Sequence, residues 1–132
     1  MRYHAKHGQK QKKAVVLWRN GLTLAVHFLL PMPVAQLTLE IRIELARSLK
    51  DRRQVVRSLK DQLRQDFNIS IAELDEATVW QTATLGVVAV SRSRDYLHGL
   101  IDEVERAAQR IAIERGALVA DSFWHYLAEA GE

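Results

Sequence analysis

Five basic side chains recur in one segment at the spacing of an α-helix. They are separated by three, four, three and four residues, and we call them the basic row: Lys50, Arg53, Arg57, Lys60 and Arg64. At about 100° per residue this spacing confines them to roughly 80° of the helix circumference. At a rise of about 1.5 Å per residue the row is roughly 21 Å long. Lys and Arg neutralise phosphates, so such a row can follow a nucleic-acid backbone. Arg52 is counted with the row as a candidate binding residue.

A solvated helix face is the alternative interpretation of the basic row, because long basic side chains often cover the edge of a core with their aliphatic stems. Two features favour binding. Like charges repel each other at these spacings on a helix, and no Glu residue interrupts the row. Asp61 and Asp66 lie off the stripe and do not neutralise it. Both interpretations stay open at this point.

The other residues that could bind a ligand or take part in catalysis form weaker patterns. Glu73, Asp75 and Glu76 lack the spacing of a calcium loop and are expected to form a solvated acidic loop. Trp80 could stack on a base, but a Trp that starts a strand more often joins the core. His98 and His125 have no fixed partner, and no serine has a nucleophile-elbow context. We therefore predict no catalytic residue, no metal site and no cofactor.

The composition is that of one globular domain. The chain has 132 residues, 48% of them apolar and 27% charged. It contains no cysteine, which excludes disulfides, thiolate zinc sites and cysteine nucleophiles. The charge is uneven: residues 1–36 hold six basic and no acidic side chains, whereas residues 37–132 hold 13 basic and 16 acidic ones. Within the second part, residues 47–64 carry seven basic and two acidic side chains, so this segment is strongly basic although the part as a whole is acidic.

Residues 1–36 have no clear period. A basic head is followed by an apolar run over residues 21–30, and this order imitates a secretion signal. The head is long, His27 interrupts the run, and the run is too short to span a bilayer. We expect residues 1–36 to be a poorly ordered extension or to reflect a start site at Met32. Residues 1–31 should then be dispensable for folding. The folded domain is predicted over residues 37–127, with a short tail at 128–132.

Apolar periodicity places the basic row on the first of two helices. Strict alternation from Leu37 to Leu45 predicts a strand with one buried face. Ser48 followed by Asp51 resembles a capping box and predicts a helix start. The helix should end near Asn68, and its expected core stripe lies beside the basic row: Leu49, Val56, Leu59, Leu63 and Phe67.

The remaining elements complete a recognisable order. Strands are predicted over residues 69–73, 80–90 and 118–124. A second helix should begin after Ser91 or Ser93 and end before Gly116, a residue suited to a left-handed cap. The order β-α-β-β-α-β with right-handed crossovers gives an α+β, ferredoxin-like split β-α-β sandwich. It has a four-stranded antiparallel sheet with two helices on one face.

Several separated motifs resemble the YlxP-like family of small, uncharacterised bacterial proteins. The resemblance covers about residues 37–125, and its signature residues are Ser48, Leu49, Phe67, Asn68, Ser70, Glu73, Trp80 and Gln81. It implies a ferredoxin-like fold and a cytoplasmic setting, because family genes often lie beside those for initiation factor two and ribosome-binding factor A. It implies no activity, so no catalytic role is carried over. The chain departs from the family at Glu44-Leu45, where Pro and Gly or Asp are usual.

Three function classes follow from these observations. The first is a non-enzymatic accessory protein that binds RNA or a ribosomal subunit through the basic row. The second is a homodimer or larger assembly formed through the sheet face that carries Thr82, Thr84 and Val88. The third is a small enzyme acting on a phosphate or carboxylate, which fold analogy alone supports. No membrane partner and no small-molecule substrate is predicted. The sheet lacks paired aromatic residues for base stacking, so RNA should meet the helix.

Overall fold

The computed structural model describes residues 32–76 and 79–127. The predictions made for residues 1–31 and 128–132 lie outside this part. The elements follow the order β-α-β-β-α-β: β1 (Val34–Arg42), α2 (Leu49–Asp66), β2 (Ser70–Glu73), β3 (Thr82–Val90), α3 (Arg94–Glu114) and β4 (Leu118–Tyr126).

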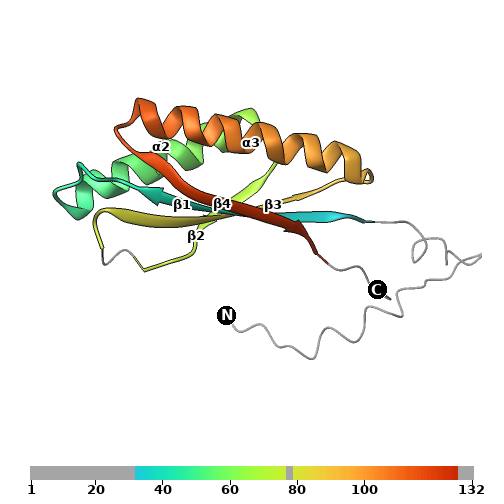
Figure 1. Cartoon of the computed structure of the whole chain (residues 1–132), viewed down its shortest axis with the longest axis horizontal. Helices are drawn as coiled ribbons and strands as arrows, with labels where there is room; N and C mark the ends of the chain where they lie inside the picture. Colours follow the sequence, from blue (N-terminus) through green and yellow to red (C-terminus); the bar gives the residue numbers. More distant parts are fainter. Residues whose placement is uncertain (1–31, 77–78, 128–132) are drawn as a thin grey trace, which may run out of the picture. The chain divides into compact units, whose positions relative to one another are not determined.

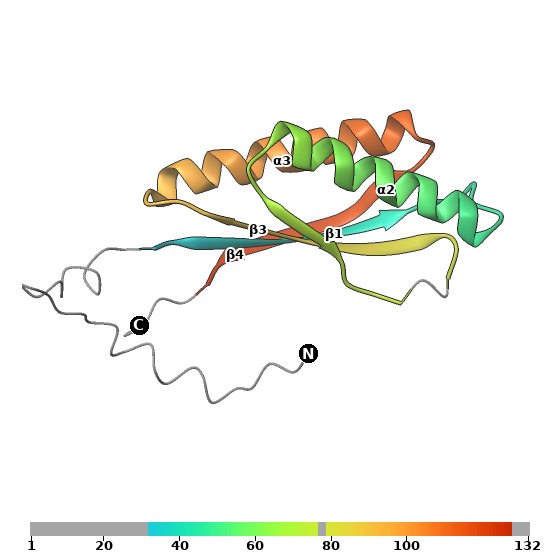
Figure 2. The same ribbon diagram turned by 180° about the vertical axis from the view of Figure 1, so that it is seen from behind.

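The four strands form one antiparallel sheet in the order β2-β3-β1-β4. Helices α2 and α3 lie side by side over one face of this sheet (Figure 1), and the view from behind shows the same layering (Figure 2). No helix in the described part of the chain covers the opposite face, which we call the open face. This arrangement is the ferredoxin-like α+β fold, and it confirms the predicted fold class.

The core lies between the two layers. Alternate residues of β1 and β3 are fully buried against the helices, as their period of two requires. The helices contribute side chains at a period of 3.6. The largest fully buried side chains include Leu37, Leu39, Leu59, Leu63, Leu85, Val87, Leu97, Ile101, Val104 and Ile111.

Strand β1 begins and ends three residues earlier than predicted. It covers Val34–Arg42 rather than residues 37–45. Ile43 still points into the core, and its N–H donates to the Gln81 carbonyl at 2.7 Å. The chain then turns, because the Ala46 N–H donates back to the Ile43 carbonyl at 3.1 Å. Leu45 is therefore 73% exposed and not part of the buried face that alternation assigned to it.

The predicted helix caps are confirmed. The Ser48 hydroxyl accepts from the Asp51 N–H at 3.1 Å, and the Ser93 hydroxyl accepts from the Tyr96 N–H at 3.1 Å. At the end of α3, Gly116 has a φ of 78°, and the Ala117 N–H donates to the Ala112 carbonyl at 2.8 Å. This left-handed turn closes the helix as a glycine cap does.

Two glycines should respond to alanine with opposite signs. Gly116→Ala forces a Cβ into the left-handed region and should lower the free energy of unfolding by about 1 kcal/mol. Gly99 lies inside α3, where an added Cβ meets nothing within 4 Å. Gly99→Ala should therefore raise that free energy by about 0.5–1 kcal/mol. Urea denaturation of both variants measures the two effects, and a shared sign would contradict this account.

Candidate nucleic-acid interface on helix α2

Helix α2 separates its residues into a core face and a basic face. Val56, Leu59 and Leu63 are buried against the sheet. The basic row turns away from the core: four of its members are exposed and Lys60 is half-buried. Leu49, expected in the core stripe, is 40% exposed because it starts the helix beyond the edge of the core. The face that carries the candidate binding residues is therefore open to a ligand.

The charges of the basic row meet no carboxylate partner in the described part of the chain. Within residues 32–76 and 79–127, none of the five side chains forms an ion pair with a carboxylate. Asp51, the nearest acidic residue to the start of the row, accepts a hydrogen bond from the Arg47 N–H at 2.9 Å. Five cationic groups with unsatisfied donors thus lie along one helix face, where they repel each other in the absence of an anion.

Two grooves flank the basic row. The first groove has a volume of 340 Å³ and runs along α2 beside Glu73 of β2. The second groove has a volume of 720 Å³ and lies between α2 and the end of α3, where Arg115 adds a further cation and Glu114 a carboxylate. Arg53 and Arg57 line both grooves and form the ridge between them. A phosphate chain in either groove would therefore meet these two guanidinium groups.

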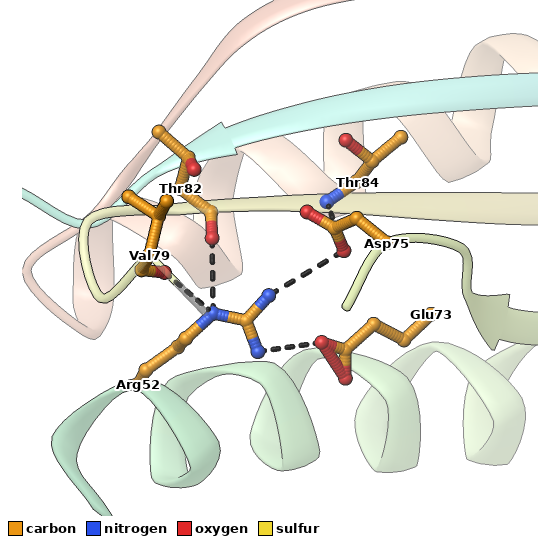
Figure 3. A network of polar contacts seen from close by, with 6 residues as sticks. All are labelled: Arg52, Glu73, Asp75, Val79, Thr82 and Thr84. Carbon is orange, nitrogen blue, oxygen red and sulfur yellow. Dashed lines mark hydrogen bonds and ion pairs between the residues drawn. The ribbon is translucent and has the colours of Figure 1, made fainter. Parts of the chain in front are cut away.

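Arg52 does not belong to the basic face. It is 2% exposed, and Figure 3 shows its guanidinium turned toward the sheet. Its terminal nitrogens form ion pairs with Glu73 and, at 3.4 Å, with Asp75. Its Nε–H donates to the carbonyls of Val79 at 3.1 Å and Thr82 at 3.0 Å. Arg52, predicted as a candidate binding residue, is therefore a buried structural residue, because each of its three guanidinium nitrogens donates to a protein acceptor.

This Arg52 network joins three segments that are distant in sequence. It ties the start of α2 to the end of β2 and to the loop that enters β3 (Figure 3). Asp75 also accepts from the Thr84 N–H at 3.2 Å. The prediction of a solvated acidic loop is therefore wrong for Glu73 and Asp75, since both carboxylates bind Arg52. The single positive charge of Arg52 offsets only part of the negative charge that Glu73 and Asp75 place beside the first groove.

The sequence contains the signal for this network. Arg52, Val56, Leu59 and Leu63 are separated by four, three and four residues, so Arg52 occupies a core position of the helix. An arginine at such a position requires anionic or carbonyl partners. The acidic pair Glu73 and Asp75 is the source of the anions, and only the fold reveals that it lies within reach.

Most of the other signature residues stabilise the fold. Ser48 caps α2, Phe67 packs against the core edge, and the carbonyl of Gln81 holds Ile43. Trp80 is 43% exposed and precedes β3, which corrects its expected place in the core. Asn68 and Ser70 are exposed at the start of β2.

The described part of the chain offers neither a metal-binding cluster nor a membrane-spanning helix. No three His, Asp or Glu side chains there come together as metal ligands would. No helix there is long and apolar enough to cross a membrane.

Sequence comparison gives two matches. A family profile described as "Protein of unknown function (DUF503)" matches residues 34–117. The uncharacterised protein YlxP of Bacillus subtilis is 39% identical over 49 residues, which are 37% of this chain and 53% of that protein. The chain thus matches about half the length of this curated relative.

Structural comparison finds similar folds at low identity. The YXEP protein of Bacillus subtilis, a dinuclear metal-binding peptidase of the M20 family, superposes with a TM-score of 0.50 at 12% identity. The match covers 73% of this chain and 26% of the peptidase. A dimeric ferredoxin-like protein of unknown function from Thermobifida fusca has a TM-score of 0.44 at 18% identity, over 87% of this chain and 98% of that one. The first likeness concerns the fold alone.

Proposed function

Because this chain belongs to the DUF503 family of proteins of unknown function, its role has to be inferred from its surface, and we propose that it is a non-enzymatic accessory protein that binds RNA. The ligand is structured ribosomal RNA, free or in a ribosomal subunit, and the place of action is the cytoplasm. The basic row of α2 holds the phosphate backbone.

One observation carries the proposal: five cations without carboxylate partners, within the described residues, occupy one face of α2 between two grooves. Outside residues 1–36, the chain has more acidic than basic side chains, so this concentration is local. A local positive strip on an acidic body attracts a polyanion and orients it.

The chemistry of the row favours phosphate contacts over base reading. Arg and Lys on an exposed helix face neutralise backbone phosphates and release counterions. Such contacts position the protein without selecting a sequence. Recognition should therefore depend on the shape of the folded RNA, with a backbone segment in the first or second groove.

Salt dependence tests the proposal. If three to five phosphates are neutralised, log K should fall with log salt at a slope of roughly −2 to −4. Replacing Arg53, Arg57 and Lys60 together by Gln should make this slope shallower by about 2. The measurement is fluorescence anisotropy of a labelled ribosomal RNA fragment with the full chain at several salt concentrations.

A matched variant controls for net charge. Arg42, Arg106 and Arg110 are exposed, lie on β1 and α3, and line neither groove. Replacing these three by Gln removes the same charge and should leave the slope nearly unchanged. Basic residues in the first 36 positions are present in both variants, so their contribution cancels. Equal slopes for the two variants would reject the basic row as the binding site.

Self-association is a second candidate function, favoured by the apolar side chains on the open face. Val88 is 40% exposed, Val90 55% and Phe123 52%. Thr82 and Thr84 lie on the same face, as the alternation of β3 predicted. Exposed apolar groups gathered on one sheet face are typical of a surface that meets another protein.

A further inference from the structure

Strand β4 is a long edge strand with little protection. Within the described residues it pairs with β1 only, whereas the other edge strand, β2, has four residues. Proteins usually guard a long edge with Lys, Pro or a bulge. The nine residues of β4 include no Lys, Arg or Pro. A register shift lies between Glu40 and Ile41 of β1, and it leaves Ala120 without an opposite residue in the pairing. Beyond this bulge, residues 121–126 run regularly to the end of the strand.

The pairing with β1 determines which backbone N–H and C=O groups of residues 121–126 point outward. The Leu127 N–H donates to the carbonyl of the opposite residue, Val34, at 2.8 Å. Because hydrogen-bonded and non-hydrogen-bonded pairs alternate in an antiparallel ladder, residues 125, 123 and 121 also turn their backbone groups toward β1. The N–H and C=O groups of Ser122, Trp124 and Tyr126 then point outward, where a further strand would bind them.

We propose that two copies of this chain associate through their β4 edges, in an antiparallel pair centred on Phe123. The inference deepens the second candidate function, self-association, and is independent of RNA binding. The two sheets then continue into one, with the two-fold axis perpendicular to it. Ser122 of one copy exchanges backbone hydrogen bonds with Trp124 of the second copy, and the reverse pair does the same.

Side-chain complementarity selects this register. With Phe123 opposite Phe123 of the second copy, each Asp121 lies opposite a His125, and all of these residues are exposed on the open face. A register centred on Ser122 would place Asp121 opposite Phe123. One centred on Trp124 would place it opposite Leu127. Only the Phe123 register joins aromatic to aromatic and acid to imidazole in non-hydrogen-bonded pairs, where side chains are closest.

The side chains of β4 that face the helices are held by contacts within the same copy. The Ser122 hydroxyl donates to Glu105 at 2.6 Å, and the Tyr126 hydroxyl donates to the Arg94 carbonyl at 2.9 Å. The Trp124 ring meets those of His98 and Tyr126 edge to face, with centroids 5.3 and 5.1 Å away. The edge is therefore held in an extended form before any partner arrives, which reduces the entropy lost on pairing.

A charge swap tests the register. The full chain should sediment as a dimer in analytical ultracentrifugation, with a dissociation constant that His125→Asp raises at least tenfold by placing carboxylates opposite each other. The double variant Asp121→His with His125→Asp restores the opposite pairing and should recover most of the affinity. Ser122→Pro removes an outward N–H without breaking the ladder to β1 and should give a monomer. Circular dichroism should show a wild-type spectrum for each variant.

Two outcomes overturn the proposal, and they differ in what they leave standing. A protein that stays monomeric at all concentrations rejects both the edge pairing and the second candidate function. A dimer that Val88→Asp dissociates, but that His125→Asp and Ser122→Pro leave intact, rejects the edge and assigns association to the open face. The RNA proposal is unaffected by either result, since none of these residues belongs to the basic row.

Discussion

Replacing Arg52 by methionine should lower the free energy of unfolding by about 2–4 kcal/mol. The variant keeps the length of the buried stem and removes the charge. It leaves Glu73 and Asp75 without their counterion and the carbonyls of Val79 and Thr82 without their donor. Removing one partner of a buried pair costs about 3–5 kcal/mol. The expected value is somewhat smaller because both carboxylates keep partial access to water.

The neighbouring arginine provides the control. Arg53→Met makes the same chemical change one residue along the helix, at an exposed side chain without an ion pair among the described residues. Such surface changes usually stay within about 0.5 kcal/mol. Urea denaturation of both variants gives the two free energies. Arg52→Lys should fall between wild type and Arg52→Met, because one ammonium cannot reproduce the planar fork of donors. Equal losses at positions 52 and 53 would mean that the network adds no stability.

A second large effect is expected in the core. Leu63 is fully buried between α2 and the sheet, and Leu63→Ala should cost about 2–5 kcal/mol through lost burial and the cavity left behind. Leu49→Ala makes the same change on the same helix at a side chain that is 40% exposed, and should cost less than about 1 kcal/mol. The midpoints of urea unfolding compare the two. A cost below about 0.5 kcal/mol at Leu63 would contradict the assignment of the helix faces.

The fold was predictable because several local signals agreed. Period-two alternation identified β1 and β3, the spacing of Val56, Leu59 and Leu63 fixed the inner face of α2, and Ser48 marked its start. These signals depend on near neighbours in the chain. Each can therefore be recognised from the sequence without the tertiary structure.

The errors arose where a distant contact decided the outcome. Leu45 continues the alternation of β1, but the turn closed by Ala46 and Ile43 places it in solvent. In the sequence, Arg52 looks like one more cation beside the basic row. In the fold it is buried by partners that lie more than twenty residues away along the chain. The basic row itself was visible in the sequence. Its two grooves were not, because Glu73 and Arg115 reach them from other elements.

The central position of β1 has a consequence for the nascent chain. β1 pairs with β3 on one side and with β4 on the other, and the second pairing brings Ala35 opposite Tyr126. Ribosomes release β1 first and β4 last of the four strands. The edge of β1 that pairs with β4 therefore stays unpaired during nearly the whole synthesis of the domain. Pairings this distant in sequence form slowly. A chain still lacking Leu118 onward exposes that edge, and chaperones that hold unpaired strands have their longest opportunity there.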